Sequence, residues 1–138
     1  MNEYLQDEAA TLRFGARLAD LALTDELVTL RGDLGTGKTT LVRGFLGALG
    51  HSGSVRSPTY TLVEPYDLDG QRIYHLDFYR IADPRELTYL GFDDLVAEPA
   101  IKLVEWPEMA GDKMPAAAVE IVLSSEGEGR RVVLRDLR

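Results

Sequence analysis

The spacing of hydrophobic and polar residues changes several times along the chain, and the first half predicts helix, strand, helix. In residues 7–23 apolar side chains recur every three or four positions, as on one face of a helix that Asp7 would cap. The run LVTLR at 27–31 has the β-rich composition of a short strand. Residues 39–50 return to helical spacing until Gly50, a residue typical of the position just after a helix.

The segment 61–81 predicts two strands that form a hairpin. Its centre is Asp69-Gly70, a dipeptide favoured in two-residue hairpin turns. Pro65 cannot donate a backbone hydrogen bond, so the first of these strands is expected at an edge of the sheet.

The remaining segments complete an α/β pattern. Residues 83–91 predict a short helix, with Asp83 as N-cap, Glu86 completing a capping box and Gly91 following the last turn; FDDLV adds a further helical turn. AIKLVEW at 100–106 predicts a strand, and EGEG separates two final strands, VEIVLSS and RRVVLRDL. We therefore expect one α/β domain over residues 1–138, with a sheet that mixes parallel and antiparallel strands.

Composition restricts the chemistry. The chain has no cysteine, so thiolate metal sites and disulfides are excluded, and only two histidines, His51 and His75. A histidine-based metal site or hydrolase triad is therefore not expected, and His75, inside an apolar run, is predicted to be a core histidine with satisfied hydrogen bonds. No apolar stretch approaches the roughly 18 residues of a membrane span, and the acidic N-terminus lacks a signal-peptide pattern. We expect a cytoplasmic protein.

The formal net charge of −8 disfavours unaided binding to nucleic acid, which usually requires a basic face. A small anion can still bind where positive potential is concentrated locally. Residues 32–40, GDLGTGKTT, have the composition for such a site.

This stretch matches the phosphate-binding pattern G-x-x-x-x-G-K-[ST], called Walker A, from Gly32 to Thr39. Glycines let the backbone N–H groups converge on phosphates, and the following helix directs its positive N-terminus at them. Lys38 would add a charge near the outer phosphates, Thr39 a hydroxyl ligand for Mg²⁺, and Thr40 a bond to an inner phosphate. A dinucleotide fingerprint is excluded because position 40 is threonine where that pattern requires glycine.

Two acidic residues end apolar strands and are candidates to assist Mg²⁺. Asp77 follows IYHL as a Walker B aspartate does, and we assign it to the water shell of the metal. Glu105 follows KLV, either as a metal ligand, directly or through water, or as the group that orients the attacking water. Trp106 beside it would pack in the core, over the nucleotide, or against a partner.

The loop SVRSPTYT at 54–61 follows the second predicted helix, where nucleotide-dependent switch loops occur. Thr59 or Thr61 could sense the γ-phosphate, although an ordinary surface turn explains the composition equally well. Arg56 and Arg80 are expected to be solvated.

The ordered set GDLGTGKTT, SPTYTLVEPY, YHLDFYR, DPRELTYLGFDD and LVEWPE resembles the TsaE (YjeE) family of small bacterial P-loop ATPases, from about residue 8 to 108. The resemblance implies a P-loop NTPase-like three-layer fold and a role in forming threonylcarbamoyladenosine on tRNA. It also implies the partners TsaB and TsaD, with TsaD transferring the threonylcarbamoyl group. The family member would bind and hydrolyse ATP with Mg²⁺ and would reach tRNA only through the complex.

The resemblance also implies roles for individual residues. ATP would be held by Gly35, Thr36, Gly37, Lys38, Thr39 and Thr40, with Thr11 of the first helix near the nucleotide and Trp106 in the signature beside Glu105. Thr39 and Glu105 would contact Mg²⁺, Asp77 would be the Walker B acid, and Lys38, Asp77 and Glu105 would act in catalysis. The SPTYT loop would be the mobile switch.

Two other functions remain compatible with the motif. A small-molecule kinase would need an acceptor pocket and usually an arginine-rich lid, and no stretch supplies such a lid. A non-catalytic nucleotide switch is also possible, but the N-K-x-D guanine motif is absent, since the only asparagine is Asn2.

Overall fold

A computed structural model describes all residues 1–138 and confirms the mixed α/β architecture. The strands are β1 (Asn2–Leu5), β2 (Leu27–Arg31), β3 (Val63–Leu68), β4 (Gln71–Asp77), β5 (Ile101–Glu105), β6 (Val119–Glu126) and β7 (Gly129–Asp136). The helices are α1 (Glu8–Arg17), α2 (Lys38–Ala48), α3 (Glu86–Leu90) and α4 (Phe92–Ala97), with 3₁₀ segments η1 (Leu18–Leu21) and η2 (Pro107–Lys113). None of these helices has the length and apolar character needed to cross a membrane.

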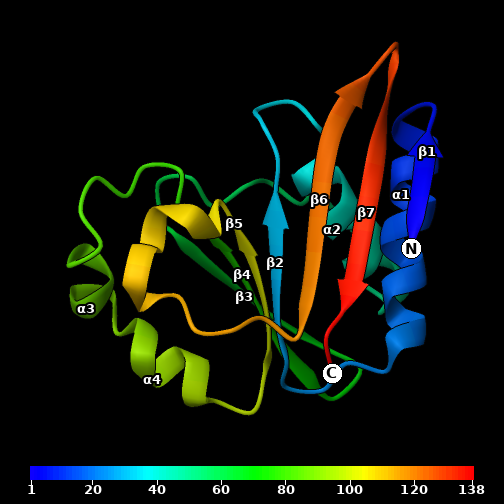
Figure 1. Ribbon diagram of the computed structural model, residues 1–138. Coiled ribbons are helices and arrows are strands. Elements are labelled where there is room, and N and C mark those ends of the chain that lie inside the picture. Colours follow the sequence, from blue (N-terminus) through cyan, green and yellow to red (C-terminus); the bar gives the residue numbers. More distant parts are fainter.

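All the strands form one seven-stranded sheet of order β1-β7-β6-β2-β5-β4-β3. The central strands β6, β2, β5 and β4 pair in parallel, whereas β1, β7 and β3 pair antiparallel with their neighbours. The carboxyl ends of β2, β4 and β5 therefore meet at one edge of the sheet, at the top of Figure 1.

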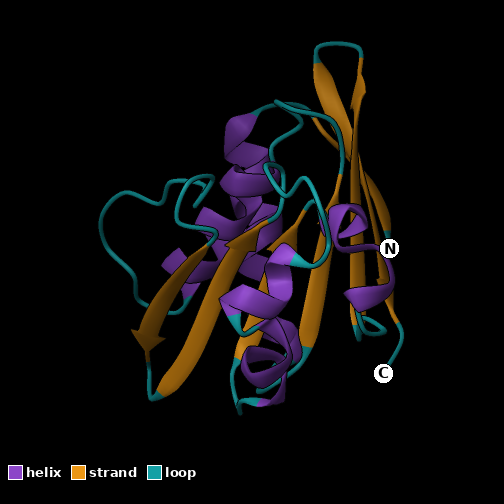
Figure 2. Ribbon diagram, turned by 90° about the vertical axis from the view of Figure 1, so that its left-hand side faces the viewer, coloured by secondary structure: helices purple, strands orange, loops and turns teal.

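Helices cover both faces of the sheet, and each face buries its own hydrophobic cluster. The larger cluster joins α1 and α2 to the sheet through residues such as Phe14, Leu41 and Phe45. The smaller cluster joins β4 and β5 to α3, α4 and η2 through residues such as Leu87 and Phe92. Figure 1 shows α2 behind β6 and β7, with α3 and α4 at the opposite side of the view, and Figure 2 shows the β6–β7 hairpin extending beyond the rest of the molecule.

The predicted β3–β4 hairpin is confirmed. Asp69 and Gly70 occupy its turn with φ values of 52° and 76°, the left-handed conformation that this turn requires. The strand β3, which contains Pro65, lies at the edge of the sheet, as the missing N–H donor predicts.

The structure corrects three predicted elements. The helix expected over 7–23 is α-helical only to Arg17, tightens into η1, and ends at Ala22 in the left-handed conformation. In the segment 83–91, α3 spans only Glu86–Leu90, and only half of the capping box is formed: Glu86 Oε2 accepts from the backbone N–H of Asp83 at 2.9 Å, but the Asp83 side chain accepts from the N–H of Arg85. The strand β1 was not predicted at all, because four residues at a sheet edge carry too short a pattern.

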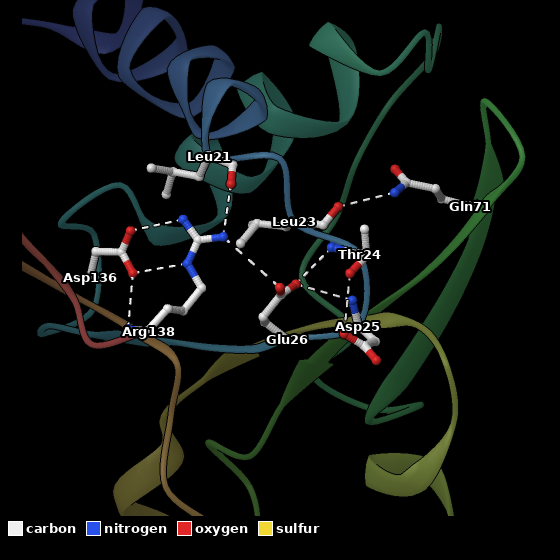
Figure 3. Close-up of polar contacts among 8 residues, drawn as sticks. All are labelled: Leu21, Leu23, Thr24, Asp25, Glu26, Gln71, Asp136 and Arg138. Carbon is white, nitrogen blue, oxygen red and sulfur yellow. Dashed lines mark hydrogen bonds and ion pairs between the residues drawn. The ribbon is translucent and has the colours of Figure 1, made fainter.

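The C-terminal residue ties the end of β7 to the connection between η1 and β2 (Figure 3). Arg138 donates from Nη1 to the carbonyl of Leu21 at 2.8 Å and from Nη2 to Asp136 at 2.8 Å. Glu26 lies 3.9 Å from the same guanidinium and accepts backbone N–H bonds from Thr24 and Asp25. This polar tie lies at the end of the sheet away from the carboxyl ends of β2, β4 and β5.

Two glycines allow α1 and α2 to approach at backbone distance. A Cβ added to Gly15 of α1 would lie 2.0 Å from the carbonyl oxygen of Leu41, and one added to Gly44 of α2 would lie 2.2 Å from that of Leu12. Because backbone atoms cannot move aside as flexible side chains do, this contact fixes the position of α2 and therefore of the loop that precedes it.

We expect Gly15→Ala to lower the free energy of unfolding by about 1–3 kcal/mol or more, since the added methyl group forces the helices apart. Urea denaturation followed by circular dichroism measures this. Gly47→Ala is the matched control: Gly47 is also a helical glycine, in α2, an added Cβ there meets nothing within 4 Å, and the substitution should stabilise the protein by about 0.5–1 kcal/mol. Equal effects of the two substitutions would contradict the backbone-contact account.

Candidate functional site

A cleft of about 320 Å³ opens at the carboxyl edge of the parallel strands, within the size range of small-molecule sites. It collects residues from segments far apart in the sequence. These are Glu8, Leu34, Gly35, Gly37, Lys38, Thr39, Thr40, Ser57, Thr59, Asp77, Tyr79, Glu105, Trp106 and Arg130.

The Walker A loop runs from the end of β2 into the first turn of α2, as the sequence predicts. Gly37 has φ of 102°, a conformation that L side chains rarely adopt. Thr36 is buried and its hydroxyl donates to the carbonyl of Asp33 at 2.8 Å, which holds the loop in its turn. The loop therefore presents backbone to the cleft at the N-terminus of an 11-residue helix.

Lys38 lies folded back against its own loop. Its side chain is only 5% exposed, and Nζ donates to the carbonyls of Gly32 and Asp33, the latter at 2.9 Å. Burial lowers the pKa of the Lys38 ammonium, and the carboxylates of Glu105 and Asp77 oppose that shift. An anion that entered the cleft would give the Lys38 ammonium a fully charged partner in place of the neutral carbonyls.

Glu105 connects three elements at the centre of the site. Its carboxylate accepts from the hydroxyl of Thr39 at 2.9 Å, and its Oε2 lies 2.6 Å from Nε2 of His75. Both Glu105 and His75 are buried, and the two strands that carry them are parallel neighbours. A carboxylate removed from water requires such partners, so His75 and Thr39 fix its position.

The prediction that His75 is a core histidine is only partly correct. The ring is fully buried, but Nδ1 has no hydrogen-bond partner, and Nε2 contacts a residue of the cleft. The sequence could not reveal this, because the register of β4 against β5, in which His75 pairs with Leu103 and lies beside Glu105, depends on how the two strands pair.

Asp77 links the end of β4 to the loop between α2 and β3. Its carboxylate accepts from the hydroxyl of Ser57, more weakly from Thr59 at 3.5 Å, and from the backbone N–H of Tyr79 at 2.8 Å. Of the two threonines considered for this loop, only Thr59 lines the cleft. Arg80 is exposed, as expected, and contacts Tyr60.

Trp106, the only tryptophan, forms one wall of the cleft. Its backbone is left-handed, with φ of 57°, so the chain turns sharply directly after Glu105. The indole ring lies 4.5 Å from Nζ of Lys38 and 4.9 Å from the ring of Tyr79. A cation held over an aromatic face is a favourable contact.

The structure thus brings together most of the predicted site residues, with two exceptions. Gly35, Gly37, Lys38, Thr39, Thr40, Asp77, Glu105 and Trp106 all line the cleft. Thr36 and Thr11 do not: Thr36 bonds within the loop to the carbonyl of Asp33, and Thr11 is fully buried, with its hydroxyl donating to the carbonyl of Asp7 at 3.0 Å and its methyl group close to Gly37. Sequence analysis gave no individual role to Glu8, Ser57, Tyr79 or Arg130, although Ser57 lies in the predicted switch loop and Tyr79 in the segment YHLDFYR.

The donor set suits a small divalent cation that retains several waters. No group of three or more histidine, cysteine or carboxylate side chains is assembled in the structure, so an all-protein metal cage is excluded. A hydroxyl from Thr39 beside the carboxylates of Glu105 and Asp77 is instead the sparse, all-oxygen environment in which Mg²⁺ is typically shared between protein, water and phosphate.

Comparison with known proteins connects this geometry to a family. Residues 5–133 match the family model described as threonylcarbamoyl adenosine biosynthesis protein TsaE. The chain belongs to the TsaE family. The match extends beyond the motifs that carried the resemblance, which ended near residue 108, and includes β6 and most of β7.

Curated relatives and a solved structure agree with this assignment. The chain is 43% identical to the tRNA threonylcarbamoyladenosine biosynthesis protein TsaE of Haemophilus influenzae, over 97% of this chain and 88% of that protein. It is 36% identical to the protein of the same name from Bacillus subtilis, over 83% of this chain and 72% of that protein. The crystal structure of YdiB from Bacillus subtilis superposes with a TM-score of 0.82 at 27% identity, covering 100% of this chain and 86% of that one.

We expect His75→Leu to lower the free energy of unfolding by about 1–3 kcal/mol, because it leaves the buried Glu105 carboxylate with one donor fewer. Urea denaturation measures the change. His51→Leu is the control, since the only contact of its ring nitrogen is a long one of 3.4 Å at an exposed position, and its effect should stay within about 0.5 kcal/mol. An unchanged stability of His75→Leu would mean that Glu105 is held without this contact.

Proposed function

We propose that this TsaE-family protein binds and hydrolyses ATP with Mg²⁺ and thereby supports threonylcarbamoyladenosine formation on tRNA. The observation that carries the proposal is the loop 32–40 at the carboxyl end of β2. Its backbone lines the cleft, and the same cleft is lined by Lys38 and by the carboxylates of Asp77 and Glu105. Converging N–H groups, a helix N-terminus and a lysine together favour a polyphosphate chain.

In this proposal the phosphates lie along residues 35–40. Lys38 leaves the carbonyls of Gly32 and Asp33 and pairs with the outer phosphates, so a buried charge gains a charged partner. The hydroxyls of Thr39 and Thr40 face the same cleft, and Trp106 limits access of water beside Lys38.

Thr39, Glu105 and Asp77 would hold Mg²⁺, partly through its water. When bound, the ion supplies positive charge that stabilises negative charge developing on the transferred phosphoryl group. Glu105 is the best placed of the acids to orient an attacking water, because His75 and Thr39 already fix its carboxylate.

The loop from Ser57 to Thr61 is the candidate switch. Hydroxyls of Ser57 and Thr59 bond to the Asp77 carboxylate, so side chains tie these two loop residues to the strand end. Directly after the loop, the carbonyl of Leu62 accepts from the backbone N–H of Asp77 at 3.1 Å. A γ-phosphate and its metal would compete for the same carboxylate, and ATP and ADP would therefore favour different positions of the loop.

The partners in this proposal are TsaB and TsaD, and tRNA is engaged only through that complex. The support is the family assignment together with the charge of this chain. A net charge of −8 opposes direct contact with the tRNA backbone.

Reconstitution with TsaB and TsaD, scoring threonylcarbamoyladenosine with and without intact Lys38, tests the role as a whole. Unchanged modification when this protein is omitted would refute it.

We expect Lys38→Ala to weaken MgATP binding by about 1.5–3 kcal/mol, the contribution of a hydrogen bond to a charged group. Isothermal titration calorimetry measures the dissociation constant. Lys113→Ala removes the same charge outside the cleft and should bind as the wild type does. If both variants retain wild-type affinity, the phosphates do not lie against Lys38.

We expect Glu105→Gln to reduce the rate of ATP hydrolysis by about 100-fold or more while retaining most of the MgATP affinity, since the lost charge acts chiefly on the transition state. Initial rates of phosphate release measure this, with Glu128→Gln at the tip of the β6–β7 hairpin as the control.

Product analysis in the same assay separates the competing functions. Equal amounts of ADP and inorganic phosphate support hydrolysis, whereas phosphate transferred to an added nucleoside or sugar supports a kinase. A preference for GTP over ATP in competition would support the switch alternative.

A further inference from the structure

One arginine of the cleft has no partner in the protein. Arg130 of β7 is absent from all the ion pairs of the structure, whereas its neighbour Arg131 pairs with Glu126 at 2.6 Å. It makes no side-chain hydrogen bond either, yet it is half-buried and lines the cleft. A cation that is partly withdrawn from water without a counter-charge favours the arrival of an anion.

The guanidinium lies directly over the phosphate-binding loop. A Cβ added to Gly37 would be 2.7 Å from Nη1 of Arg130 and 3.4 Å from a methyl group of Thr11. A side chain at Gly37 would therefore have to displace the guanidinium of Arg130, in addition to adopting an unfavourable positive φ.

Strand pairing fixes this position. Arg130 pairs with Ser125 on β6 and with Leu5 on β1, so it has a strand on either side. Gly129 precedes it where an added Cβ would lie 2.5 Å from the carbonyl oxygen of Leu5, so β1 packs closely against β7 at this point. Arg130 shares the face of β7 that carries the buried Val132, which is the face covered by α1 and α2.

The sheet order places Arg130 and the acids on opposite sides of the loop. Strand β2, which leads into the loop, lies between β6 and β5. Asp77 and Glu105 stand on the β5–β4 side with Thr39, and Arg130 approaches from the β6–β7 side. One end of the cleft is thus suited to a metal ion, and the other end carries an unpaired cation.

We propose that Arg130 binds the inner phosphates of the nucleotide, on the side of the loop away from the metal. This inference rests on the proposed function, because it assumes that a nucleoside polyphosphate occupies the cleft. With the outer phosphate near Lys38 and the metal-binding acids, the inner phosphates extend toward the opposite flank, within reach of a planar guanidinium that can donate two parallel hydrogen bonds.

The test is calorimetric titration of MgATP, ADP and inorganic triphosphate into the wild type, Arg130→Gln and Arg131→Gln. We expect Arg130→Gln to bind all three ligands about 10- to 100-fold more weakly. Arg131→Gln removes the same charge one residue away, on the opposite face of the strand, and should bind within twofold of the wild type. Arg130→Lys keeps the charge but loses the two parallel hydrogen bonds of the guanidinium, so it should give intermediate affinities. It keeps the test valid if the glutamine variant does not fold.

Three results would overturn the inference. If Arg130→Gln and Arg131→Gln bind the ligands with equal affinity, Arg130 does not contact the phosphates. A loss confined to ATP and ADP, with inorganic triphosphate unaffected, would place Arg130 on the base or ribose. If the wild type binds none of the three ligands, the proposed function fails together with this inference; if the wild type binds and Lys38→Ala does not, failure at Arg130 leaves the proposed function intact.

Discussion

Parallel pairing of β2, β5 and β4 is the constraint on which the whole site depends. In this register Leu30 pairs with Glu105, and Glu105 in turn pairs with Asp77. The last residues of β4 and β5 are thereby aligned in one row with the next-to-last residue of β2, close to the start of α2. Neither carboxylate needs a long or flexible side chain to reach the cleft, because the backbone hydrogen bonds of the sheet already place it there. A one-residue slip between β4 and β5 would direct these side chains to opposite faces.

The electrostatics of the cleft follow from this alignment. An acidic chain concentrates its positive potential at one point, where the N-terminus of α2, Lys38 and Arg130 converge, and it places Asp77 and Glu105 beside them. The lysine is buried against backbone carbonyls and an aromatic ring, which are weaker partners than a phosphate. The site therefore combines desolvated charges of both signs, which Mg²⁺ and a polyphosphate would complement.

The remaining structure holds this row of residues in place. Backbone contact between α1 and α2 at Gly15 and Gly44 fixes the helix that begins at Lys38. The antiparallel strands β6, β7 and β1 extend the sheet on the other side of β2, and the family match includes most of this extension. The strands beyond the Walker motifs thus position Arg130, the residue of this extension that lines the cleft. At the far end of β7, Arg138 anchors the chain to Leu21 and Asp136.

The sequence alone determined the local features, because each rests on neighbours along the chain. The Walker A loop with its flanking strand and helix, the hairpin turn at Asp69-Gly70, the bond from the N–H of Asp83 to the Glu86 carboxylate, and the acids that end two strands are all properties of short segments. Only the tertiary structure decided which distant residues meet. The contact of His75 with Glu105, the bond of Ser57 to Asp77, the strand β1 and the approach of Arg130 to Gly37 depend on strand order and register. Those are set by burial of two hydrophobic faces over the whole sheet, a balance that no short stretch of sequence contains.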